Sequence, residues 1–133
     1  MNLDKGRKRI LFVDDELDIV KLLSQRLTSW GYEVLTATSG EESLRITEEE
    51  QPDLVLLDIV MPGVNGRDVC TRLKTNPKTF DIPVIFLTAL AMPHQIEKAL
   101  NLGADDYIVK PFKAQEMRER IEKCFLRRPE LTY

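Results

Sequence analysis

LVLLDIVMPG, residues 54–63, is the stretch of sequence that decides the fold. It opens with four apolar residues and changes character at Asp58, after which a proline and a glycine follow. A short apolar run that ends in turn-forming residues is typical of a strand covered on both faces, as in a parallel sheet. The stretch therefore predicts a buried strand that presents a carboxylate at its carboxyl end.

Two other apolar runs end in charged residues. Residues 10–13 lead into Asp14 and Asp15, and residues 107–109 lead into Lys110. If these runs are parallel strands of one sheet, the acids and the lysine meet at its carboxyl edge. That edge is where open α/β sheets bind their ligands.

Apolar runs alternate with segments of helical periodicity along the whole chain. We expect strands near residues 9–13, 32–37, 53–57, 83–87 and 105–109. Helices are expected over 16–29, 40–50, 66–74, 93–102 and 113–126. In the first helix one buried stripe would contain Ile19, Leu22, Leu23 and Leu27. This order predicts an α/β doubly wound parallel sheet with helices on two faces.

Composition limits the class of protein. The chain has 133 residues, 43% of them hydrophobic, which suits one domain with a real core. A net charge of −3 provides no basic surface for direct binding of nucleic acid. No apolar stretch is long enough for a membrane span, so we expect a cytoplasmic protein. Cys70 and Cys124 are widely separated, and we expect a reduced pair.

The expected cluster of acids has a defined chemistry. Carboxylates this close repel one another, and a divalent cation relieves the repulsion. Oxygen ligands favour a hard ion, so Mg²⁺ is predicted, with Mn²⁺ able to replace it. Asp14 and Asp15 would hold the metal, Asp58 would attack phosphorus as a nucleophile, and Lys110 would offset charge on the phosphoryl group. The hydroxyl of Thr88, at the end of the fourth strand, could donate to a phosphoryl oxygen.

Simpler readings exist for the single motifs. Asp14 and Asp15 could cap the first helix, and Thr88 could be an ordinary β-branched strand end. Four strand ends that carry acids, a hydroxyl and a lysine together are hard to explain by packing alone.

At this point a family resemblance is visible. The chain resembles the response-regulator receiver domain (CheY-like) of two-component signal transduction in five motifs, which are Asp14-Asp15, then Asp58, then Met61-Pro62-Gly63 with Gly66, then Thr88-Ala89, and finally Lys110-Pro111-Phe112. The similar region runs over residues 9–126, which leaves 1–8 as a flank and 127–133 as a tail or the start of a linker. The resemblance implies a flavodoxin-like fold with strand order 2-1-3-4-5.

The same resemblance implies roles for the residues. Asp58 is the phosphoacceptor and receives a phosphoryl group from a sensor histidine kinase or histidine phosphotransfer protein. Metal ligands are Asp14, Asp15, Asp58 and the backbone carbonyl of Val60, while Thr88 and Lys110 bind phosphoryl oxygens. A cis bond before Pro111 is also implied. Such a domain catalyses its own phosphorylation and dephosphorylation and turns over no external substrate.

A signal would leave the site through Thr88 and Tyr107. In the family the threonine moves toward the phosphoryl group and the aromatic residue rotates inward. This changes the face formed by the fourth helix, fifth strand and fifth helix, which controls a partner or an attached output domain. Because Val60 and Leu90 are apolar where relatives often have polar residues, a slow loss of the phosphoryl group is expected.

Other functions remain open at this stage. The serious rival is a receiver-like docking module that is never phosphorylated. A haloacid-dehalogenase-like phosphatase needs an acid where this chain has Val60, and a nucleotide-binding module needs a phosphate-cradling loop after the first strand. Asp106 and Arg120 are similar to a pair used in dimers of transcription-factor receivers, although Ile96 replaces a basic residue there, so dimerisation through that face is left open. The cognate kinase and the output pathway are not readable from the sequence.

Overall fold

The computed structural model describes residues 6–89 and 92–126, and within them five strands alternate with five helices. The strands are β1 (Arg9–Val13), β2 (Glu33–Ala37), β3 (Leu54–Leu57), β4 (Val84–Thr88) and β5 (Asp106–Val109). The helices are α1 (Leu17–Ser29), α2 (Gly40–Glu50), α3 (Gly66–Lys74), α4 (Pro93–Asn101) and α5 (Ala114–Leu126). All strands pair in parallel in the order β2-β1-β3-β4-β5. The predicted flavodoxin-like fold is confirmed, and every boundary lies within one residue of its expected place.

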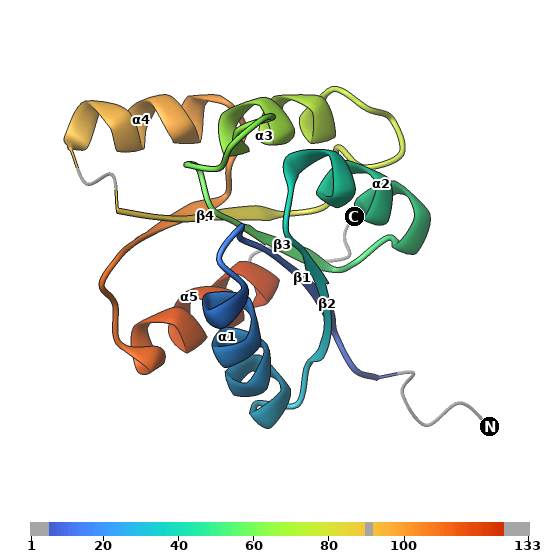
Figure 1. Cartoon of the computed structure of the whole chain (residues 1–133), viewed down its shortest axis with the longest axis vertical. Coiled ribbons are helices and arrows are strands. Elements are labelled where there is room, and N and C mark those ends of the chain that lie inside the picture. Colours follow the sequence, from blue (N-terminus) through green and yellow to red (C-terminus); the bar gives the residue numbers. More distant parts are fainter. Residues whose placement is uncertain (1–5, 90–91, 127–133) are drawn as a thin grey trace.

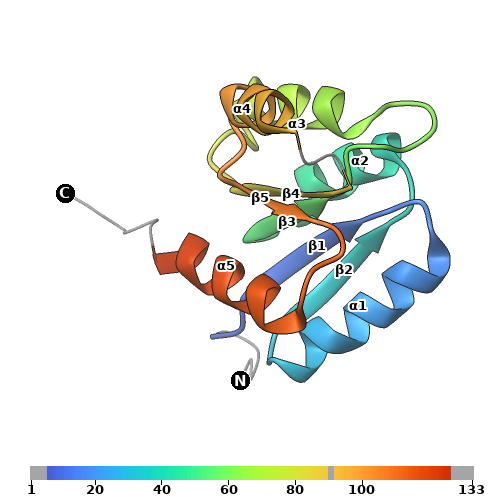
Figure 2. The ribbon, with the colours of Figure 1, turned by 90° about the vertical axis from the view of Figure 1, so that its left-hand side faces the viewer.

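Helices cover both faces of the sheet. Figure 1 shows α2, α3 and α4 above the sheet and α1 and α5 below it, and the turned view in Figure 2 shows the same layers. Each layer has its own core, because side chains alternate between the faces along every strand. Leu11, Val55 and Phe86 pack under the upper helices, whereas Phe12, Leu56 and Ile85 pack against the lower pair. The central strands are buried throughout and read as continuous apolar runs for that reason.

Local signals in the sequence set the helix ends. The side chain of Ser39 accepts a hydrogen bond from the Glu42 amide at the start of α2, and that of Asn65 accepts one from the Asp68 amide at the start of α3. Each cap satisfies an amide that has no partner within the helix. After α1, Gly31 turns the chain with a φ of +96°, which a residue with a side chain rarely adopts. The helices that these caps and turns delimit return the chain to the amino edge of the sheet before each new parallel strand.

The predicted apolar stripe of α1 is wrong at one position. Leu27 is fully buried and Val20 is 8% exposed, but Leu22 is 57% exposed. A stripe that contains Val20 and Leu27 turns Leu22 toward the side of the helix, since each residue advances by about 100°. There Leu22 lines an apolar groove of about 520 Å³ between α1 and α5, together with Phe112 and Met117.

The cysteines behave as expected. Cys70 on α3 and Cys124 on α5 are buried, and neither forms a disulfide bond. Separately, none of the helices in the described ranges is both long enough and apolar enough to cross a membrane.

Candidate functional site

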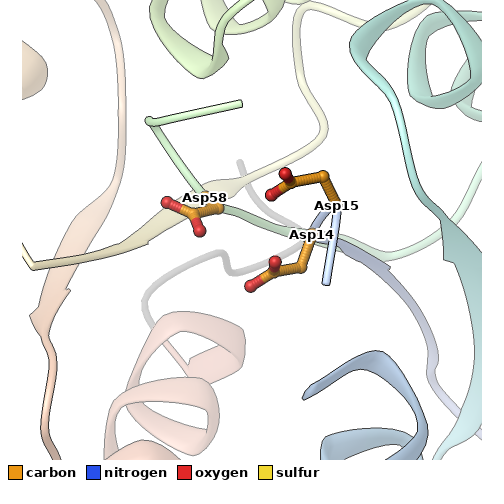
Figure 3. A group of neighbouring side chains, drawn as sticks. All are labelled: Asp14, Asp15 and Asp58. Carbon is orange, nitrogen blue, oxygen red and sulfur yellow. The ribbon is translucent and has the colours of Figure 1, made fainter. Parts of the chain in front are cut away.

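The acids gather where the neighbouring strands β1 and β3 end. The amide of Asp58 donates to the Val13 carbonyl at 3.1 Å, and the amide of Asp14 donates to the Ala37 carbonyl at 3.2 Å. These bonds extend the sheet ladder by one residue and fix both acids at its carboxyl edge. One oxygen from each of Asp14, Asp15 and Asp58 lies within 4.8 Å of the others, and Figure 3 shows the side chains side by side. The predicted cluster of carboxylates is therefore present.

Lys110 joins the cluster from the end of β5. Its Nζ lies 3.1 Å from Oδ2 of Asp58 and 3.3 Å from Oδ2 of Asp14. The backbone amide of Lys110 donates to the Thr88 carbonyl at 2.8 Å, which aligns the ends of β4 and β5. The peptide bond between Lys110 and Pro111 is cis, as the resemblance implied. One ammonium group thus bridges two carboxylates.

The alternative that Asp14 and Asp15 cap α1 is wrong. The residue at the cap position is Glu16, and no side chain bonds to the cap. Asp14 instead accepts from the Glu16 amide at 3.0 Å, within the loop that precedes the helix. Asp14 is fully buried while Asp15 is exposed, so the two acids face different environments.

Burial and charge compete at Asp58, which is 6% exposed. Burial raises the pKa of its carboxyl group; hydrogen bonding and charge from Lys110 lower it, and the negative charge of Asp14 raises it again. The net direction is upward. For Lys110, burial alone would lower the pKa, but its bonds to Asp58 and Asp14 reverse the direction and raise it. Lys110 therefore stays protonated, but its single positive charge does not fully neutralise the negative charge of the carboxylates around it.

The donor set fits a hard divalent cation. All its atoms are carboxylate oxygens, from Asp14, Asp15 and Asp58, which are the ligands that Mg²⁺ prefers. The Val60 amide donates to Oδ1 of Asp58 at 3.1 Å, so the Val60 backbone lies beside the same carboxylate. Three negative groups with a single ammonium also leave negative charge that a cation would neutralise.

The backbone around Asp58 depends on Gly66, whose role the sequence did not reveal. A Cβ atom at Gly66 would lie 2.2 Å from the Asp58 carbonyl oxygen and 2.7 Å from Cα of Ile59. The Gly66 amide donates to the Ile59 carbonyl at 2.8 Å, which closes the loop between β3 and α3. Gly66 allows α3 to begin directly against the end of β3. Only the absence of a side chain could have indicated this close approach.

Around the acids lies a depression of about 400 Å³. Thr88, Ala89 and Val60 line it together with Asp58 and Lys110. Thr88 itself is fully buried. The depression places the threonine, the acceptor and the lysine around one space, as the sequence predicted.

Tyr107 lies on β5, which β4 separates from β3, the strand that leads into the acceptor, and its side chain is buried. It is 5% exposed, and its ring meets that of Phe86 at 6.4 Å between centroids, edge to face. Next to it, Asp106 pairs with Arg120 at 2.7 Å within the chain. Leu90, the second apolar residue of the lifetime prediction, falls outside the described residues.

Comparison with known proteins shows to which family the chain belongs. The model of the response regulator receiver domain matches residues 10–122. A relative from Cyanophora paradoxa, "Probable transcriptional regulator ycf27", is 48% identical over 96% of this chain and 52% of its own length. The "Alkaline phosphatase synthesis transcriptional regulatory protein PhoP" of Bacillus subtilis is 44% identical over 94% of this chain and 51% of its own. This chain thus spans about half the length of these curated relatives.

Solved structures agree with the family. The receiver domain of a histidine kinase from Syntrophus aciditrophicus has a TM-score of 0.85 and 31% identity, over 93% of this chain and 94% of its own. The beryllofluoride-activated receiver domain of RstA from Klebsiella pneumoniae has a TM-score of 0.82 and 29% identity, over 87% of this chain and 97% of its own. The chain belongs to the response-regulator receiver domains of two-component systems. Phosphorylation and Mg²⁺ binding at an acidic pocket are general features of that family.

Proposed function

We propose that the protein is a signalling switch that accepts a phosphoryl group on Asp58 in a Mg²⁺-dependent reaction. The observation that carries the proposal is the contact of Lys110 with both Asp58 and Asp14 inside a cluster of three carboxylates. Such a site in a receiver domain has a nucleophile, an acidic set of metal ligands and a cation for the phosphoryl oxygens. The donor would be a sensor histidine kinase or a phosphotransfer protein, and the setting would be the cytoplasm.

In the transfer, a carboxylate oxygen of Asp58 forms a bond to phosphorus while the bond from phosphorus to the donor nitrogen breaks. Imidazole leaves, and an aspartyl phosphate remains. Mg²⁺, held by Asp14, Asp15, Asp58 and the Val60 carbonyl, would offset negative charge on the phosphoryl oxygens. Lys110 would hold another of these oxygens, and the Thr88 hydroxyl would donate to a third.

The surface beside the acceptor suits a protein donor. Leu17 at the start of α1 is 70% exposed, Leu22 is 57% exposed, and Val60 is 61% exposed. The groove between α1 and α5 reaches the site at Ala89 and Lys110. Apolar groups around a charged centre give a partner area to bury, so we assign this rim to the phosphohistidine-bearing protein.

Output would follow from Thr88 and Tyr107. Phe86 and Tyr107 are register partners on β4 and β5, and Thr88 pairs with Val109. A displacement of Thr88 toward the phosphoryl group would therefore be felt directly by the strand that carries Tyr107. The face of α4, β5 and α5 would then bind a partner or an attached output domain, and could mediate a dimer.

The phosphoryl group should persist. The exposed side chain of Val60 has no polar group with which to position a hydrolytic water. We expect loss over minutes or longer, and a phosphate-release assay that shows loss within seconds would contradict this.

The first test is intact mass after incubation with acetyl phosphate and Mg²⁺. We expect a gain of one phosphoryl group, abolished in Asp58→Asn and without the metal. Asp68→Asn is the matched control, because Asp68 is an exposed acid in the first turn of α3, and it should label as the native chain does. No gain with any donor would refute the proposal and favour the docking module that is never phosphorylated.

A further inference from the structure

Glu16 occupies the N-cap position of α1, but its side chain does not cap the helix. Short polar side chains are preferred at this position, because they can accept a hydrogen bond from an amide of the first turn. Glu16 takes part through its backbone, where its carbonyl accepts from the Val20 amide at 3.0 Å. Within the described ranges its carboxylate forms neither a hydrogen bond nor an ion pair. Capping therefore does not explain the charge at this position.

The backbone of Glu16 is fixed beside the acids of the candidate site. Its amide donates to Oδ1 of Asp14 at 3.0 Å, so its side chain begins at the edge of the carboxylate cluster. From there it lines the depression of about 400 Å³ together with Asp15 and Asp58. Of the described residues that line this depression, only Lys110 is a cation. Glu16 thus adds a third acid to a space that has a single positive charge.

This additional acid lies outside the inner set of metal ligands. The residues whose carboxylate oxygens come within 4.8 Å of one another are Asp14, Asp15 and Asp58. Glu16 is not a member of that group, and its side chain is exposed to water. Mg²⁺ keeps several waters when carboxylates bind it, and a water on a cation donates hydrogen bonds to acceptors around the inner ligands. An acid at the rim of the depression is such an acceptor.

We propose that Glu16 is a positioning residue for the divalent cation: its carboxylate accepts a hydrogen bond from a water on the cation and adds negative charge to the site. The inference rests on the proposed function, in which Asp14, Asp15 and Asp58 bind Mg²⁺. Coulomb attraction between a carboxylate and a divalent cation across one layer of water, screened by salt, changes an affinity by about fivefold. Glu16 therefore makes the cation bind more tightly without being one of its direct ligands.

The test measures Mn²⁺ binding to the unphosphorylated protein from the electron paramagnetic resonance signal of the free ion, and Mg²⁺ binding by competition. Glu16→Gln removes the charge and keeps the size of the side chain. Asp18→Asn is the matched control, because Asp18 is an exposed acid in the first turn of α1 that does not line the depression. We expect Glu16→Gln to weaken the binding of both ions about fivefold, and Asp18→Asn to weaken it less than about twofold.

Native affinity in Glu16→Gln would overturn the inference. Equal losses in Glu16→Gln and Asp18→Asn would also overturn it, because any charge at the start of α1 would then have the same effect. Urea denaturation without metal excludes damage to the loop: the midpoint of Glu16→Gln should stay within about 0.3 M of the native one, and a larger fall would mean a structural role. The native chain tests the proposed function in the same titration. If it binds neither ion, that function is refuted and the inference with it; if it binds and Glu16→Gln binds equally well, only the inference is refuted.

Discussion

Replacement of Gly66 by alanine is the most direct test of how the acceptor is held. The new methyl group would lie 2.2 Å from the carbonyl oxygen of Asp58 and 2.7 Å from Cα of Ile59. Carbon and oxygen atoms in contact are normally about 3.3 Å apart or more, so backbone at the end of β3 or the start of α3 must move by roughly 1 Å. Because neither neighbour is a flexible side chain, this movement also displaces Asp58.

The cost follows from two opposing effects. Forcing a methyl group into packed backbone costs about 3 kcal/mol at the upper end of the usual range. Alanine is favoured over glycine in a helix by about 1 kcal/mol, which returns part of the loss. We therefore expect Gly66→Ala to lower the free energy of unfolding by about 2 kcal/mol.

The assay is urea denaturation followed by fluorescence of Trp30, the single tryptophan. With a slope near 2 kcal/mol per molar urea, the midpoint should fall by about 1 M. Labelling of Asp58 by acetyl phosphate should slow as well, since the carboxylate no longer meets Lys110 in the same geometry.

Two other glycines separate a steric clash from backbone strain. Gly31 has a φ of +96° and no atom within 4 Å of an added Cβ, so Gly31→Ala should cost about 1 kcal/mol by strain and leave labelling unchanged. Gly6 has open space and an ordinary φ, so Gly6→Ala should alter neither. If Gly66→Ala has the same urea midpoint and the same labelling rate as the native chain, the close approach of α3 to the acceptor does not constrain Asp58.

Further changes test the charges and the core. Asp58→Asn should stabilise the metal-free protein by about 1 kcal/mol at neutral pH, because burial raises the pKa of Asp58 and its ionised form is therefore unfavourable in the fold. Because the fold favours the protonated carboxyl group, the native chain regains stability as the pH falls through the raised pKa of Asp58, and the advantage of the mutant should shrink. A difference in the free energy of unfolding that does not change with pH would contradict this prediction. Thr79→Val should cost about 1 to 2 kcal/mol in urea denaturation without slowing the labelling of Asp58, since the buried Thr79 hydroxyl donates to the Leu73 carbonyl at 2.7 Å; an unchanged midpoint would argue against that bond. Burial raises the pKa of the Cys70 thiol to about 11, so iodoacetamide at pH 8 should modify it only after unfolding, and rapid labelling of the native protein would refute its burial.

The sequence predicts the fold closely because local and long-range signals agree. Residues 54–57 are apolar at every position, which fits a central strand, and Gly31 and Gly103 mark two helix ends with positive φ. The positions of Asp14 and Asp58 follow from strand order alone, since β1 and β3 are neighbours. The residues of the candidate cluster could therefore be named before any coordinates.

The features that could not be predicted depend on the direction in which a side chain points and on contacts between residues that are distant in the sequence. Periodicity placed Leu22 in the core, but in the structure its side chain lines a groove. A stripe of four apolar residues does not fix the rotation of a helix about its axis closely enough to decide which residue at the edge of the stripe is buried. The burial of Tyr107 arises from packing against side chains that are distant in the sequence, such as Phe86 on β4. No local sequence pattern predicts a contact of this kind. The same holds for Gly66, whose importance comes from the backbone it touches.

The placement of Lys110 explains why β5 would transmit the signal. Lys110 is the residue that directly follows β5, and its ammonium group now bonds Asp58 and Asp14. In the proposed function an added phosphoryl group competes for that ammonium, so the end of β5 must adjust. Tyr107 lies on the same short strand, and its carbonyl accepts from Arg120 of α5 at 3.0 Å. Because strand and helix are joined at that point, a change of partners at Lys110 would reach the outer face through the backbone of β5, in addition to the proposed movement of Thr88 and Tyr107.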